Sequence, residues 1–150
     1  MRPPIIAALA PAAIVLLLTI SPHAQTSKTF RTRLAPVPID LAMAATITGS
    51  GAVTAALTGS KLTFTGTFEG LATPATIAQV HKGPVAGVRG PVLFDLTVTH
   101  ATSGTISGSV ELTATQIADL EKRRLYVQVH SEKAPDGNLW GWLFPARQDR

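Results

Sequence analysis

The segment IAQVHKGPVAGVRGPVLFDL, residues 77–96, joins two short apolar runs through a loop rich in glycine and proline. The first run ends at His81, directly before the loop. A later segment, LYVQVH at residues 125–130, ends in the same Gln-x-His pattern. Apolar runs of this length, bounded by turn residues, are typical of β-strands. We therefore expect two strands that each finish at a histidine.

Alternation of apolar and polar residues predicts strands in most of the remaining chain. Leu62, Phe64 and Phe68 are an even number of residues apart, so they would share one face of a strand. We expect residues 30–34 to form an edge strand, because prolines follow it closely. Further strands are expected at residues 91–99, 106–112 and 139–144, with turns at 49–51, 59–60 and 135–137. The close spacing of these strands predicts an all-β protein, an antiparallel β-sandwich.

One short helix is expected after residue 112. Thr113 and Gln116 have the spacing of a capping box, in which each side chain bonds the other residue's backbone N–H. Ile117 and Leu120 then give the helix one apolar face. The basic run at residues 122–124 would fall in the last turn, where cations complement the helix dipole. We interpret this run as a helix end rather than as a surface for nucleic acid or membrane.

The first 24 residues have the features of a secretory signal peptide. Arg2 precedes an uncharged apolar stretch at residues 5–20, which is short for a membrane span. Cleavage after Ala24 would leave one domain, residues 25–150, in the periplasm or outside the cell. An uncleaved N-terminal anchor is the alternative. We expect no stable membrane span once the signal is removed.

Charge and cysteine content exclude several classes of function. The net charge of the chain is +4, and loss of Arg2 would leave +3 on the mature domain. A small excess without clustered basic residues does not predict binding to nucleic acid. The chain has no cysteine, which excludes disulfides, thiolate metal sites and thiol catalysis.

Four ordered motifs resemble those of the CHRD domain, which occurs in chordin and in exported bacterial proteins. They are HKGPVAGVRGPVLFDL at 81–96, LTATQ at 112–116, YVQVHS at 126–131 and PDGNLWGWL at 135–143. The family patterns are G-P-A-x-x-G-x-x-G-P-V-V-F-D-L after a histidine, L-T-x-x-Q, Y-V-N-V-H-T and P-x-G-E-I-R-G-Q-L. The resemblance extends over roughly residues 30–143. It implies an extracytoplasmic β-sandwich, immunoglobulin-like or superoxide-dismutase-like, and a role in binding rather than a defined reaction.

The chain departs from the family at positions that bear on chemistry. Gln79 stands where the family often has the first histidine of H-I-H, and Gln128 stands for an asparagine. Trp140 and Trp142 lie where the family has arginine and glutamine, and Asn138 replaces an acid. If the family's histidines form a metal site, this chain has lost one ligand.

His81 and His130 are the candidate metal ligands. If their strands are neighbours, we expect both histidines at the same end of the sandwich, where they would bind copper or zinc. The simpler interpretation, which the small number of ligands favours, is that each imidazole bonds a backbone carbonyl and holds a loop. On their strands, Gln79 shares a face with His81, and both Tyr126 and Gln128 share a face with His130.

Trp140 and Trp142 point the same way from the last strand and are candidates for contact with a protein or a glycan. They would alternatively cover one sheet face against the helix. No nucleophile, base and acid can be assembled from the sequence, so we expect no enzymatic activity. Three hypotheses remain: a non-enzymatic exported module that binds a macromolecule or belongs to the cell envelope, a copper- or zinc-binding protein, and a glycan-binding protein.

Overall fold

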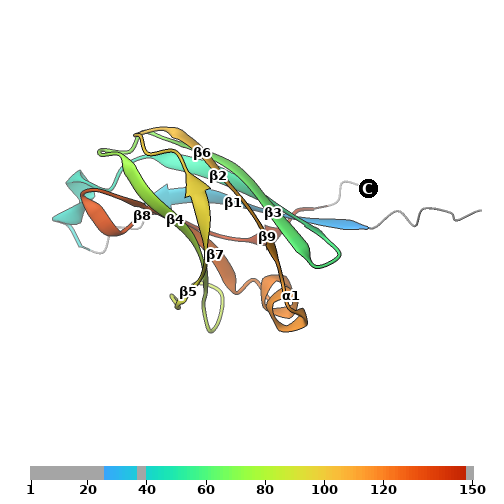
Figure 1. Ribbon diagram of the computed structural model, residues 1–150. Coiled ribbons are helices and arrows are strands. Elements are labelled where there is room, and N and C mark those ends of the chain that lie inside the picture. Colours follow the sequence, from blue (N-terminus) through green and yellow to red (C-terminus); the bar gives the residue numbers. More distant parts are fainter. Residues whose placement is uncertain (1–25, 37–39, 148–150) are drawn as a thin grey trace, which may run out of the picture.

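The computed structural model describes residues 26–36 and 40–147. The expected signal peptide, residues 1–24, lies outside the described residues. The described chain folds into an all-β domain with one short α-helix (Figure 1). No helix among the described residues is long and apolar enough to cross a membrane.

Eight strands form a closed antiparallel β-barrel in the order β1-β2-β3-β6-β5-β4-β7-β8, and β8 pairs back with β1. The strands are β1 (Ser27–Pro36), β2 (Ser50–Thr58), β3 (Lys61–Glu69), β4 (Ala75–Lys82), β5 (Val92–Val98), β6 (Gly104–Glu111), β7 (Leu125–Ser131) and β8 (Ala134–Trp142). The two-residue strand β9 (Phe144–Pro145) pairs with Phe30 and Arg31 of β1. A 3-10 turn, η1 (Met43–Ala45), precedes β2, and helix α1 (Ala114–Glu121) links β6 to β7.

The expected β-sandwich is therefore wrong, because the strands close into a barrel. The expected all-β class is confirmed. Two seams close the barrel, and each joins only two residue pairs. At one seam β1 meets β8 through Ala35 and Pro36, and at the other β5 meets β6 through Thr97 and Val98. Alternating strands look the same in a sandwich and in a barrel, so the sequence pattern could not distinguish the two.

Strand β1 is not the edge strand that we expected. Its first eight residues pair with β2 and its last two pair with β8, so it lies inside the sheet. Pro36 does not interrupt this pairing, because it is the final residue of the strand, and Pro38 lies outside the described residues. Arg31 and Arg33 alternate with the buried Phe30, Thr32 and Leu34 and point outward.

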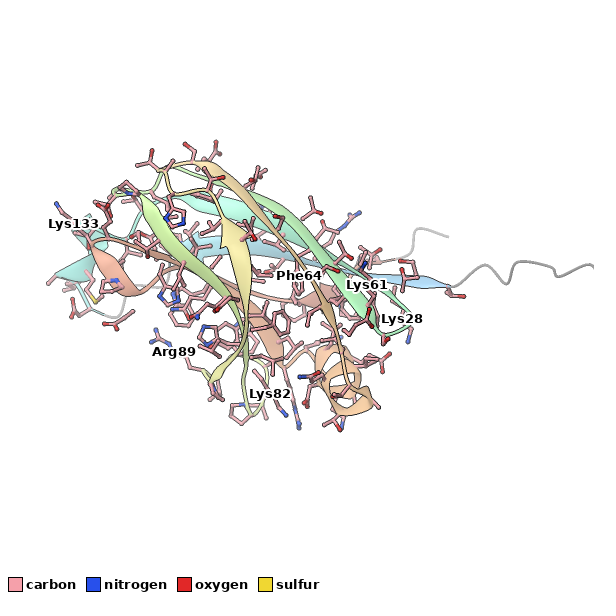
Figure 2. The ribbon with its side chains drawn as sticks, viewed as in Figure 1. Lys28, Lys61, Phe64, Lys82, Arg89 and Lys133 are labelled. Carbon is pink, nitrogen blue, oxygen red and sulfur yellow. The ribbon has the colours of Figure 1, made fainter. Side chains whose placement is uncertain are left out.

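The barrel interior is filled by alternate residues of the strands. Leu62, Phe64 and Phe68 of β3 are all buried, as their spacing predicted. Figure 2 shows Phe64 inside the barrel and Lys61 at its surface. Val80 of β4 and Val127 of β7 reach the same core. Close packing of this interior keeps the outer face of β4 and β7 in a fixed position.

The capping box of α1 is confirmed, since the Thr113 side chain accepts from the Gln116 N–H and the Gln116 side chain accepts from the Thr113 N–H. The basic run lies after the helix, which ends at Glu121. Arg124 forms an ion pair with the buried Asp119 instead of lying in the last turn. The predicted turn at residues 135–137 is wrong as well, because these residues belong to β8 and the chain reverses at 132–133.

Candidate functional site

The candidate site lies on the outer face of the barrel, over β4, β7 and β8. On β4, Gln79 and His81 alternate with core residues, and on β7 the outward residues are Tyr126, Gln128 and His130. Strand pairing sets them in rows. One row places Gln79 beside Gln128 and then Trp140, and the next places His81 beside Tyr126 and then Trp142.

Although this face points away from the core, most of it is shielded from solvent. His81 and Trp140 are each 8% exposed, and Tyr126 is 1% exposed. The loop between β4 and β5, residues 83–91, provides part of the cover. Its Arg89 guanidinium lies 4.0 Å from the ring centre of Trp140, a cation–π contact. Figure 2 shows Arg89 next to this part of the barrel.

Gly90 fastens the loop to the site through its backbone. Its N–H donates to the Tyr126 hydroxyl, and its carbonyl accepts from that hydroxyl, both at 3.1 Å. The same carbonyl lies 3.1 Å from Nδ1 of His81. A Cβ at Gly90 would lie 1.8 Å from the Lys82 carbonyl oxygen, so only glycine allows this approach. The sequence gives no sign of these contacts, because Gly90 lies in a loop rich in glycine and proline and has no side chain to indicate them.

The two histidines are held in the same way. Nδ1 of His81 faces the Gly90 carbonyl, and Nδ1 of His130 lies 2.6 Å from the Pro135 carbonyl. A carbonyl only accepts, so in the neutral form of either ring the proton lies on Nδ1, which leaves a lone pair on Nε2. Both Nε2 atoms are buried and have no hydrogen-bond partner among the described residues. The ring centroids of His81 and His130 are 6.4 Å apart.

The environment keeps His81 neutral. Burial lowers its pKa below the ordinary 6.5; the bond to the Gly90 carbonyl partly opposes this shift, and the nearby His130 adds to it. The His81 ring also stacks on Tyr126 with a centroid distance of 4.9 Å. A neutral ring with a free Nε2 can bind a metal ion or accept a hydrogen bond.

Aromatic rings continue the cluster beyond His81. The ring centroid of Tyr126 lies 4.4 Å from Trp142 and 5.7 Å from Trp140. The indole N–H of Trp140 is buried without a partner among the described residues. The side-chain NH2 groups of the two glutamines bond residues other than the histidines. Gln128 donates to the Asp136 carbonyl and Gln79 donates to the Asp95 carboxylate, each at 2.7 Å.

The expectation that both histidines lie at the same end of the sandwich is wrong. The strands run antiparallel, and His81 is opposite Tyr126 while His130 is opposite Ile77, so the two lie toward opposite ends of the paired segment. Their side chains nevertheless converge over the outer face. Nδ1 of each histidine makes the carbonyl bond that the simpler, loop-holding interpretation expects, while Nε2 of each has no partner among the described residues.

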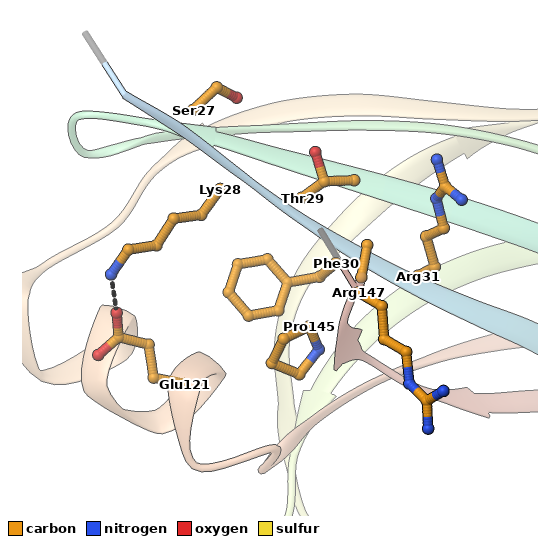
Figure 3. A pocket seen from close by; sticks show the side chains of 9 residues that line it. Ser27, Lys28, Thr29, Phe30, Arg31, Glu121, Pro145 and Arg147 are labelled. Atoms are coloured by element: carbon orange, nitrogen blue, oxygen red, sulfur yellow. Dashed lines mark hydrogen bonds and ion pairs between the residues drawn. The ribbon is translucent and has the colours of Figure 1, made fainter. Parts of the chain in front are cut away.

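Of the grooves outside the histidine cluster, the two of largest volume bear on the choice of site. One of about 600 Å³ runs along β1 near Phe30 and Pro145, and the Lys28–Glu121 ion pair borders it (Figure 3). The other, about 550 Å³, adjoins the cluster and is lined by Arg31, Thr32, Arg33, Ala52, Val53, Thr54, Trp140, Gly141, Trp142 and Phe144. The larger groove contains no histidine and no unpartnered buried polar atom, so we place the site at the cluster.

The order of these motifs along the barrel agrees with a known domain. The sequence model of the CHRD domain matches residues 36–143, well over half of the chain. The chain belongs to the CHRD family. The seven outer-face residues all fall within the matched part of this CHRD domain. No curated protein and no solved structure matches the chain significantly.

Proposed function

We propose that this CHRD-domain protein is an exported, non-enzymatic binding protein, and that its outer-face site binds one copper or zinc ion through Nε2 of His81 and His130. The observation that carries the proposal is the pair of buried, unpartnered Nε2 atoms. A buried polar atom without a partner costs about 1–3 kcal/mol. Two such atoms on neighbouring rings therefore call for a shared partner.

The Nδ1 atom of each ring supports the same conclusion. Metal-binding histidines commonly donate their other N–H to a carbonyl, which fixes the tautomer and the direction of the ring. His81 and His130 both have this arrangement, toward Gly90 and Pro135. Hydrogen bonding only to hold loops would account for the Nδ1 atoms but would leave the Nε2 atoms without a purpose.

A binding role fits the cluster better than catalysis does. Among the described residues, no carboxylate bonds either imidazole, and the Tyr126 hydroxyl is occupied by Gly90. A general base or a nucleophile would need such a partner to be activated. The proposed extracytoplasmic location, periplasmic or secreted, rests on the apolar segment at residues 5–20.

Metal titration of the purified protein tests the proposal. We expect one equivalent of copper or zinc to bind the wild type, and His81→Gln or His130→Gln to weaken binding at least tenfold. His100→Gln is the matched control, because His100 is exposed in the β5–β6 loop. Melting curves would show that the variants fold. Equal, sub-stoichiometric binding by all four proteins would remove the proposal.

The groove beside the cluster favours a second candidate, contact with a protein or glycan partner. Trp142 and Phe144 give it an aromatic surface, and Arg31 and Arg33 add two positive charges with no acidic residue in the lining. Tryptophan fluorescence would be measured against neutral and acidic polysaccharides. A shift with an acidic polymer that Trp142→Ala removes is expected, and an unchanged spectrum throughout would exclude glycans.

A further inference from the structure

We propose that the His81–His130 site selects monovalent copper, Cu(I), in linear two-coordinate geometry, over Zn(II) and Cu(II). This inference rests on the proposed metal-binding function and names the ion and its coordination. Three properties of the site lead to it: the number of ligands, the separation of the rings, and the absence of negative charge.

The number of protein ligands is smaller than zinc prefers. Among the described residues, no group of three or more His, Cys, Asp or Glu side chains could hold a metal ion together. Structural zinc sites have four protein ligands and catalytic sites have three with a water. The nearest carboxylate on the adjoining strand, that of Asp95, is exposed and accepts from Gln79. A site of two imidazoles suits an ion that is stable with two ligands, as Cu(I) is.

The ring separation fits a linear bridge. A metal–nitrogen bond is about 2.0 Å and the ring centre lies about 1.2 Å behind the nitrogen, so a linear N–metal–N unit places the ring centroids about 6.4 Å apart. A tetrahedral angle of about 109° would bring them to about 5.2 Å. The observed separation between His81 and His130 is 6.4 Å. The rings would have to move together by about 1 Å to hold a tetrahedral ion.

The electrostatics of the cluster also favour the lower charge. An imidazole that binds a metal through Nε2 brings no charge, and the Arg89 guanidinium, which stacks on Trp140, adds positive potential. The cost of moving an ion from water into a buried site rises with the square of its charge, so a divalent ion pays about four times as much as a monovalent one. The rings of Tyr126, Trp140 and Trp142, which pack on one another beside His81, supply no neutralising charge.

The test compares ions on the purified wild type and on four histidine variants under anaerobic conditions. Cu(I) affinity is measured by competition with bicinchoninate, Ag(I) serves as a redox-inert analogue, and Zn(II) and Cu(II) are titrated in parallel. We expect one Cu(I) or Ag(I) per chain, bound at least 100-fold more tightly than Zn(II). X-ray absorption of the Cu(I) form should show two nitrogen ligands at about 1.9 Å, the short distance of a low-coordinate site.

The variants separate coordination from folding. His130→Gln should lower Cu(I) affinity at least 100-fold, and His100→Gln should leave it unchanged. His130→Met should keep Cu(I) within about tenfold of the wild type, because a thioether is a soft ligand that Cu(I) accepts. Loss of Cu(I) in the methionine variant equal to that in the glutamine variant would contradict direct coordination by His130.

The remaining outcomes distinguish this inference from the function on which it rests. Zn(II) binding as tight as Cu(I), and equally dependent on both histidines, would overturn the selectivity and leave the metal-binding function standing. Binding of every ion at a level that His81→Gln and His130→Gln do not change would overturn both.

Discussion

Replacement of Tyr126 by phenylalanine tests whether the site depends on its covering loop. The hydroxyl makes two hydrogen bonds with Gly90, one to its N–H and one from its carbonyl. After the change the carbonyl keeps its contact with His81, but the partly buried N–H has no partner. A lost bond together with an unsatisfied donor costs about 1–3 kcal/mol, so we expect about 2 kcal/mol of destabilisation.

Two assays report this change at different levels. For a domain of this size, about 2 kcal/mol lowers the melting temperature by about 5–10 °C. The same free energy corresponds to an opening equilibrium constant of the loop that is about 30-fold larger, which is measured as faster hydrogen exchange of the Gly90 amide. Thr63→Val is the control, because it removes an exposed hydroxyl whose contact with Ser109 is long, at 3.4 Å. A melting temperature within about 1 °C of the wild type, with unchanged exchange at Gly90, would refute the loop-anchoring argument.

Three further predictions concern His81, Asp119 and Gly90. Because the pKa of His81 is lowered in the folded protein, the unfolded chain binds more protons than the folded protein below pH 6.5. The contribution of His81 to stability should therefore be complete above pH 6.5 and fall as the pH drops from 6.5 toward the folded pKa. Melting curves recorded between pH 7.5 and 4.5 should lack this slope in His81→Gln, and a slope identical to that of the wild type would contradict the prediction. Asp119→Ala should lower the free energy of unfolding by about 1–3 kcal/mol, since it removes the buried partner of Lys82. The control Glu121→Ala breaks an exposed ion pair and should lower the free energy of unfolding by less than about 1 kcal/mol. Equal denaturant midpoints for the two variants would show that the buried pair contributes nothing. Gly90→Ala should expose Trp140 and Trp142 to quenchers, because its Cβ would collide with the Lys82 carbonyl and lift the loop; unchanged acrylamide quenching of tryptophan fluorescence would argue against that displacement.

Local patterns of this chain could be predicted from its sequence because short-range physics determines them. The capping box at Thr113 and Gln116 depends on residues three apart, and the shared face of Leu62, Phe64 and Phe68 depends only on alternation. Strand closure depends on pairs far apart in the chain. The contact of Ala35 with Trp140 has no local signature, so the barrel was read as a sandwich.

The members of the site could be named from the sequence, but their arrangement could not. Gln-x-His at two strand ends indicated His81 and His130, and alternation assigned Gln79, Tyr126 and Gln128 to the same faces. Antiparallel pairing then placed the histidines toward opposite ends, a consequence of strand order that no short motif contains. The role of the Gly90 backbone had no side-chain signal, although the Gly-Pro pair marked the place where the loop rejoins the sheet.

The short seam between β1 and β8 bears on how the protein is made. The first strand can pair with β2 as soon as that hairpin emerges, but its last two residues wait for partners more than a hundred positions later. Until Leu139 and Trp140 arrive, the growing chain has unpaired backbone at both margins of an incomplete sheet. A chain of this design therefore stays prone to self-association until its C-terminal quarter has been made, and the imidazole cluster takes shape in that same final step.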